Sequence, residues 1–301
     1  MRRRFHTLDV FTETKLAGNP LAVVHDSDGL DTAAMQAIAR EFNLSETVFV
    51  LPPDDPANTA KIRIFTPGNE LPFAGHPTVG TAVLLAEMRA ADRLGGAGVV
   101  VAIEETIGLI KVDVSRRQGK ATRGVFGLPR LPTQLPTQRE PRLMAEALGL
   151  SVEDIQCTTH QPGDFSAGVP YTIVPLNGLD ALARAVSLAG PAFDLAFGGT
   201  PYPAVYLTVN EAPLRWRTRM FGAGMGVVED PATGSAVAAF AGAIMAWDKP
   251  QDGTHQHIIT QGVEMGRPSE IVLTLDVEQG ILRDATVGGT AIIITEGTID
   301  I

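Results

Sequence analysis

The sequence has little cysteine and no long apolar run. Its 301 residues include one cysteine, Cys157, so a disulfide framework within the chain and a thiolate zinc cluster are both excluded. No apolar stretch reaches the roughly 18 residues that favour a membrane span. The basic start at Arg2–Arg4 leads into no apolar segment of the kind a signal peptide requires. We therefore expect a reducing, cytoplasmic compartment and no membrane association.

Positive charge is also scarce. The chain has 24 Lys and Arg against 34 Asp and Glu, a formal net charge of −10. This excess of acid argues against nucleic acid or an anionic membrane surface as the main partner. Apolar residues make up 45% of the chain, as in well-packed globular proteins, and the length is comfortable for two cores. A negatively charged substrate would have to be bound by local dipoles.

What the sequence does contain is a short motif that occurs twice. Each copy reads polar residue, Pro, two residues, Gly, hydroxyl residue, Ala, and the copies run over 76–82 and 230–236. An internal repeat of this kind predicts two half-molecules, each contributing one helix start to a shared site. Superposing Pro77 on Pro231 pairs His76 with Asp230, Gly80 with Gly234 and Thr81 with Ser235.

Both copies predict the start of a buried helix. Pro is favoured at the first helical position and Asp is a good N-cap, so we expect helices beginning at Pro77 and Pro231 with His76 and Asp230 as caps. The following residues, 78–86 and 232–247, carry no charge, which is typical of helices buried on every side. Small residues leave the first-turn amides accessible, so each helix start is predicted to bind an anion. Two ordinary core helices are the alternative interpretation.

The rest of the chain is mostly strand-like. Helices are predicted over 31–42, with Asp31 as cap, and over 142–148. Four prolines between Gly127 and Arg142 predict a linker. The order of elements predicts an α+β fold with two domains, residues 1–128 and 129–281. Strands are predicted at 5–11, 21–24, 47–51, 61–65, 99–103, 109–114, 171–174, 204–209, 215–221, 257–261, 271–275 and 291–295.

Four side chains are candidates for proton transfer or substrate contact. Glu46 begins an apolar strand, and a carboxyl at the mouth of an apolar pocket can carry protons near neutral pH. His76 offers an imidazole with a reference pKa of about 6.5. Asp230 and Ser235 could bind polar groups of a substrate. Each also has an ordinary structural interpretation, as a cap, a solvated group or packing.

Two other arrangements are weaker. Ser235, His76 and Asp230 could form a nucleophilic triad on paper, but Ser235 lies within a first helical turn, an unusual place for an exposed nucleophile. His255 and His257 share one strand face without a third ligand nearby, so no metal site is predicted.

Seven motifs occur in order along the chain: Asp9–Thr12 (DVFT), Ala17–Pro20 (AGNP), Asn43–Thr47 (NLSET), Phe65–Pro67 (FTP), Glu70–Thr78 (ELPFAGHPT), Glu229–Ala236 (EDPATGSA) and Gly266–Ser269 (GRPS). Together they resemble the phenazine-biosynthesis PhzF-like isomerase family. That family is similar in fold to diaminopimelate epimerase, with two pseudo-symmetric domains, each a β-barrel-like sheet around a central helix, and an active site in the cleft between them. The resemblance also implies a homodimer, and a last strand, within about 282–301, that joins the first domain.

The resemblance implies roles for particular residues. Glu46 would be the acid/base residue, which in the phenazine enzyme moves a proton between carbons of a cyclic dienamine acid without a cofactor. His76, Asp230 and Ser235 would hold polar groups of the substrate and assist protonation. Further substrate contacts would come from Asn19 and Thr233 and from backbone amides at Gly75 and Gly234.

The expected function is a cofactor-independent isomerase acting on a small carboxylate, expected to be cyclic. Related racemases carry a Cys at each helix start, whereas this chain has His76 and Asp230 there, which disfavours two-thiol chemistry. An epimerase, racemase or lyase acting on an amino or hydroxy acid stays open. So does a metabolite-binding or interaction protein without catalysis, although none of the four polar positions is lost.

Overall fold

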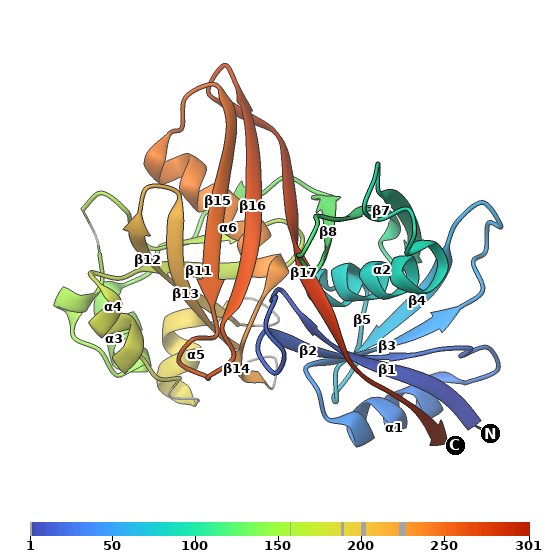
Figure 1. Ribbon diagram of the computed structural model, residues 1–301. Helices are drawn as coiled ribbons and strands as arrows, with labels where there is room; N and C mark the ends of the chain where they lie inside the picture. The colour runs from blue at the N-terminus through green and yellow to red at the C-terminus, as the bar shows by residue number, and fades with distance from the viewer. Residues whose placement is uncertain (1, 157, 188–189, 200–202, 223–226) are drawn as a thin grey trace. The chain divides into compact units, whose positions relative to one another are not determined.

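The computed structural model describes residues 2–156, 158–187, 190–199, 203–222 and 227–301 (Figure 1). Cys157 therefore lies outside the described residues. The chain divides into two compact units: Met1–Gly127 together with Gly288–Ile301, and Leu128–Val287. Among the described helices, none has the length and apolar character needed to cross a membrane.

The first unit is a sheet closed around a helix. Its strands pair β1–β2 antiparallel, β2–β3 parallel, β3–β4 antiparallel, β4–β6 parallel, and then antiparallel through β7 to β8. β17 pairs with both β1 and β8, which closes the ring. The strands are β1 (Arg2–Val10), β2 (Asn19–Val24), β3 (Glu46–Leu51), β4 (Ala60–Phe65), β5 (Glu70–Leu71), β6 (Val99–Glu105), β7 (Gly108–Arg116), β8 (Thr122–Gly127) and β17 (Ile281–Asp300).

Helix α2 (Gly75–Ala90) fills this ring (Figure 1). It contacts β1, β2, β3, β6, β7 and β8, and every residue from Gly75 to Ala86 is buried. The small residues of the motif allow this close approach. A Cβ at Gly80 would lie 2.7 Å from side-chain atoms of Leu21 and Val10, so a larger residue there would push the helix from the sheet.

The second unit repeats the connectivity of the first. β10–β11 is antiparallel, β11–β12 parallel, β12–β13 antiparallel, β13–β15 parallel and β15–β16 antiparallel, the same order of senses as from β1 to β7. Short β5 pairs with β4, and short β14 pairs with β13 in the same way. The strands are β9 (Thr133–Gln134), β10 (Gly163–Ser166), β11 (Pro170–Pro175), β12 (Val205–Ala212), β13 (Arg215–Gly222), β14 (Val227–Asp230), β15 (Gly253–Gln261) and β16 (Ser269–Glu278).

Helix α6 (Gly234–Asp248) is the counterpart of α2 and packs on β9, β10, β11 and β16. Shorter helices cover the outer faces of the strands. α1 (Thr32–Phe42) packs on β2, β3 and β4, while α3 (Pro141–Leu148), α4 (Leu179–Arg184) and α5 (Pro191–Phe197) pack mainly on β11 and β12. A 3₁₀ helix, η1, spans Val152–Asp154. The predicted α+β fold of two pseudo-symmetric units, each a barrel-like sheet around a buried helix, is confirmed.

The predicted start of the first motif helix is wrong. α2 begins at Gly75 with Ala74 as its N-cap, so His76 is a helical residue and Pro77 is the third residue of the helix. Pro is tolerated at this position because the amides of the first turn have no partner within an α-helix. The helix therefore begins two residues before the predicted proline.

The predicted start of the second motif helix is also wrong, in the opposite direction. α6 begins at Gly234 with Thr233 as its N-cap, and Pro231 lies three residues before the helix. Asp230 is the last residue of β14. The two sequence repeats therefore differ in local structure, even though the connectivity around them is the same.

The predicted linker is partly wrong. β9 lies within the proline-rich segment and pairs with β10, and α3 begins at Pro141. Helix 31–42 is confirmed, because Asp31 accepts a hydrogen bond from the backbone N–H of Ala34 and α1 follows. The short helices α4 and α5 were not predicted, since six or seven residues display too little of a 3.6-residue period.

Candidate active site

One cluster of predicted site residues lies in the first unit, at the start of α2. Glu46 and Asn19 are the first residues of β3 and β2, two strands that run parallel. His76, the second residue of α2, contacts both side chains. Its Nε2 is 3.3 Å from Oε2 of Glu46, and its Nδ1 is 3.2 Å from Nδ2 of Asn19. The structure therefore brings three of the predicted site residues together.

The surroundings of His76 determine its charge and its tautomer. The side chain is 5% exposed, and burial lowers the pKa of His76 to about 3. The ring is therefore neutral at physiological pH and carries one N–H. An amide nitrogen only donates, so the Asn19 contact makes Nδ1 the acceptor and places the ring proton on Nε2, on the side of Glu46. The N–H of His76 thus lies on the side of the Glu46 carboxyl, 3.3 Å from Oε2, without the geometry of a hydrogen bond.

A second cluster of predicted site residues lies in the second unit. Asp230 is 7% exposed and accepts a 2.5 Å hydrogen bond at Oδ2 from Oγ1 of Thr233. Ser235 is the second residue of α6, and its hydroxyl lies 2.7 Å from the hydroxyl of Tyr171. The first-turn amides of α6 begin at Gly234. Acid, hydroxyl and amide groups thus gather at this helix start.

Gln261, the last residue of β15, was missed by the sequence analysis. It is completely buried, and its Nε2 donates to the backbone oxygen of Asp230 at 2.7 Å and to Oγ1 of Thr233 at 3.0 Å. Its Oε1 accepts from the backbone N–H of Thr233 at 3.3 Å and from the hydroxyl of Tyr206 at 3.2 Å. A glutamine at the end of an alternating strand gives no signal of this role in the sequence.

Glu105, the last residue of β6, occupies the corresponding place in the first unit and was also missed. Oγ1 of Thr78 lies 2.7 Å from Oε1 of Glu105 and 2.8 Å from the backbone oxygen of Ala74, the N-cap of α2. Burial raises the pKa of Glu105 to about 8. The carboxyl is therefore largely protonated at neutral pH, in contact with the first turn of α2.

Matched Arg–Glu pairs hold the short strands that precede both motifs. Arg63 on β4 donates to Glu70 on β5 at 2.7 and 2.6 Å. Arg219 on β13 donates to Glu229 on β14 at 2.8 and 2.9 Å. Each guanidinium also lies over the ring of the phenylalanine two positions later, at 5.1 and 4.8 Å. The pairing of these glutamates with arginines was not predicted, although Arg-x-Phe occurs in both strands.

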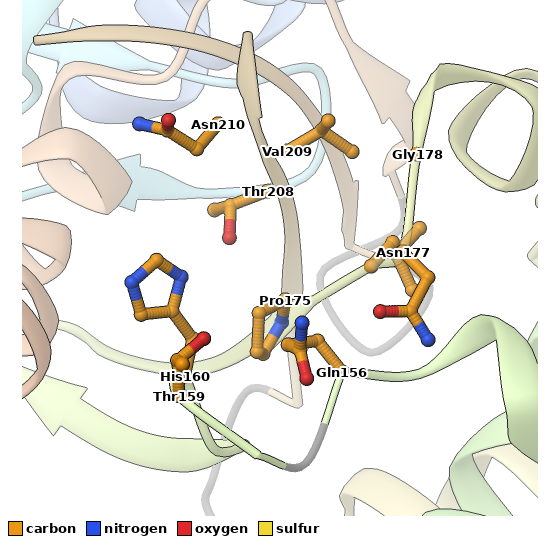
Figure 2. Close-up of a pocket in the computed structure, with 10 residues that line it drawn as sticks. Gln156, Thr159, His160, Pro175, Asn177, Gly178, Thr208, Val209 and Asn210 are labelled. Carbon is orange, nitrogen blue, oxygen red and sulfur yellow. The ribbon is translucent and has the colours of Figure 1, made fainter. Parts of the chain in front are cut away.

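A separate pocket of about 290 Å³ lies in the second unit and is lined mainly by neutral polar side chains (Figure 2). His160 borders it, stacked on Trp247 at 4.8 Å and hydrogen-bonded to Asp248 at 3.0 Å. None of the predicted site residues is among its described lining. The residues that line it are Gln156, Thr159, His160, Pro175, Leu176, Asn177, Gly178, Thr208, Val209 and Asn210.

The two histidines considered as metal ligands are engaged elsewhere. Nδ1 of His257 lies 3.2 Å from Nε1 of Trp216, and Nε2 of His255 lies 2.7 Å from the backbone oxygen of Gln251. In the described part of the chain, no group of three His, Cys, Asp or Glu side chains is arranged to hold a metal ion.

Solved structures define the class of protein. A Bacillus anthracis phenazine biosynthesis protein of the PhzF family superposes with a TM-score of 0.87 at 26% identity, with each chain covered over its full length. A hydroxyproline epimerase from Agrobacterium vitis superposes with a TM-score of 0.65, covering 99% of this chain and 92% of that one, and its 14% identity shows the fold alone. The chain therefore has the duplicated fold found in PhzF proteins and in proline-racemase-like epimerases.

Sequence comparison gives the family. A family model described as phenazine biosynthesis-like protein matches residues 8–297, and the chain belongs to this family. An uncharacterized isomerase of Mesorhizobium japonicum is 49% identical over 99% of this chain and 98% of that protein. The trans-2,3-dihydro-3-hydroxyanthranilate isomerase of Pseudomonas chlororaphis is 36% identical over 97% of each. The chain is thus an isomerase of the PhzF-like family.

Proposed function

We propose that this isomerase moves a proton within a small cyclic carboxylate without a cofactor, and that Glu46 is the acid/base residue. The contact of Glu46 with the neutral ring of His76 is the observation that carries this proposal. A general acid/base must be held in place and still reach the substrate. The Glu46 side chain is 16% exposed, so it is fixed by its neighbours without being sealed from a ligand.

His76 and Asn19 orient the carboxyl of Glu46. Because His76 is neutral, it places no positive charge beside the Glu46 carboxyl, so the two side chains do not form a full ion pair. Asn19 fixes the tautomer that turns the ring N–H toward Glu46. Glu46 would remove a proton from one substrate carbon, exchange it with solvent and deliver a proton to another carbon, so the protein ends the cycle in its starting state.

The second unit contributes binding and a second polar group. Asp230 and Ser235 would contact polar groups of the substrate and assist protonation, with Thr233 beside them. The helix-start amides at Gly75 and Gly234 would bind the carboxylate, because the N-terminus of a helix attracts anions.

The relatives suggest the first compound to test. The protein of Pseudomonas chlororaphis named as trans-2,3-dihydro-3-hydroxyanthranilate isomerase matches this chain over nearly its full length. Its substrate is a cyclic acid with a carboxylate, an amine and a hydroxyl, which suits a site with amide donors and two acid/base groups. We propose this compound, or a cyclic acid of similar size and polarity, as the substrate.

The experiment follows this compound in deuterium oxide with the purified protein. We expect an isomeric product that carries carbon-bound deuterium, detected by mass spectrometry, in the presence of a chelator and without added cofactor. Glu46→Gln should reduce the rate by at least about 100-fold, the scale for loss of a general acid/base. Glu41→Gln, which changes an exposed carboxylate on α1, is the matched control and should retain full activity. An active Glu46→Gln variant, or an isomer without carbon-bound deuterium in every protein tested, would contradict the proposal.

A further inference from the structure

A series of buried hydrogen bonds leads from the core of the second unit to Asp230. Tyr206 contacts both Thr218, at 2.9 Å, and Gln261, at 3.2 Å. Gln261 makes two hydrogen bonds with Thr233, one through its acceptor atom and one through its donor atom, and Thr233 contacts Asp230. These five residues are each at most 7% exposed. Water therefore has little access to compete for their bonds.

The contacts of Gln261 determine the direction of each hydrogen bond. Its Oε1 faces the backbone N–H of Thr233, which only donates, so its Nε2 must face the two oxygen atoms on the other side. Oγ1 of Thr233 therefore accepts a hydrogen bond from Gln261. The hydroxyl proton of Thr233 is then directed at Oδ2 of Asp230, 2.5 Å away.

Resting on the proposed function, we propose that Gln261 is a positioning residue for Asp230. It holds the backbone on both sides of the 230–233 turn and orients the Thr233 hydroxyl toward the carboxylate. Gly262, the next residue, lets the end of β15 lie close to this turn, since a Cβ there would lie 2.6 Å from the backbone oxygen of Pro231. Gln261 thus fixes the place and rotamer of Asp230 without touching the substrate itself.

The corresponding position of the first unit shows why an amide is needed. Glu105 can donate a hydrogen bond only when it is protonated, and it contacts Thr78 through one carboxyl oxygen. An amide donates at any pH, so the orientation of Thr233 is independent of protonation. Gln261→Glu would replace this donor with an acceptor facing two oxygen atoms.

The test compares Gln261→Met and Gln261→Glu with a matched control, Thr172→Val. Met has a volume close to that of Gln but makes no hydrogen bonds. Thr172 is buried in the same unit and donates to Asp164 at 2.7 Å, so its replacement also removes a buried hydrogen bond. With trans-2,3-dihydro-3-hydroxyanthranilate, we expect kcat of both Gln261 variants to fall by roughly 10- to 100-fold with KM nearly unchanged, because misplacing a reacting group slows chemistry more than binding. Thr172→Val should retain kcat.

Crystal structures of the variants give a readout that does not depend on activity. We expect the Thr233 hydroxyl to rotate away from Asp230 in Gln261→Met. In Thr172→Val it should keep its contact with Asp230. Retained kcat in Gln261→Met, or an unchanged contact of Thr233 with Asp230, would overturn the inference. If the wild-type protein does not convert the compound, the choice of substrate fails, and the crystallographic comparison alone decides the role of Gln261.

Discussion

Single residues of this protein owe their chemical state to their neighbours more than to their type. His76 is neutral because it is buried, and its proton lies on Nε2 because Asn19 occupies Nδ1. The sequence and its family resemblance named both residues and Glu46 as candidates, and the structure places the three side chains together, while their roles stay a prediction. Neither the sequence nor the resemblance indicated Gln261 or Glu105, because the partners of a buried polar side chain at a strand end come from distant segments of the chain.

Glu105 should make stability depend on pH. Its folded-state pKa of about 8 lies above the ordinary value of 4.5, so the folded state binds more protons between these limits. The stability it contributes is complete below about pH 4.5 and is lost as pH rises through 8, with a slope of up to about 1.4 kcal/mol per pH unit. Glu105→Gln should abolish this slope, measured by urea unfolding from pH 5 to 9. Parallel curves of unfolding free energy against pH for the wild-type protein and Glu105→Gln would refute the raised pKa of Glu105.

Whole elements were predicted where the pattern is long and regular, and missed where packing decides. Alternation located most strands, and the lack of charge identified α2 and α6 as buried helices. The helix starts were misplaced because proline fits any position of a first turn, so the choice depends on where the chain enters the barrel. The short strands β5, of two residues, and β14, of four, depend on pairing with β4 and β13, which their own segments do not encode.

The paired short strands offer a prediction at this scale. Arg219 and Glu229 are more buried, at 8% and 14% side-chain exposure, than Arg63 and Glu70, at 23% and 31%. Arg219 also donates to backbone oxygens of Leu182 and Ala185. Arg219→Met should therefore reduce the free energy of unfolding by about 3 kcal/mol or more, since it leaves a buried carboxylate without its partner.

The duplicated pair provides the matched control for that measurement. Arg63→Met removes the same kind of contact from a more exposed site, and its effect should be clearly smaller by urea denaturation. Equal effects of the two substitutions would show that burial does not determine the strength of these pairs.

At the scale of the whole molecule, the sequence repeat correctly indicated a duplicated fold, and the order of strand senses in the two units shows how far the duplication extends. Composition could not have given this result, because parallel and antiparallel pairing depend on the path of the chain. The substrate could not be predicted either, because it depends on the shape of a binding surface. The repeat encodes only the polar groups and helix starts that are expected to hold a substrate.

The family resemblance predicts a homodimer, which we propose as the state in solution. Sedimentation equilibrium at micromolar concentration should give twice the mass of one chain. A monomer mass across the full concentration range would contradict the proposal.

The pairing of β1 with β17 has a consequence for biosynthesis. Arg2–Val10 must align with Ala291–Asp300, so the first strand described here pairs with the last one, nearly 300 residues later in the chain. The ring of the first unit cannot close before β17 has been translated, and by then most of the second unit has already been made. The order of synthesis and the order of completion are thus reversed, and the unfinished sheet of the first unit leaves open edges, to which chaperones can bind, until β17 emerges.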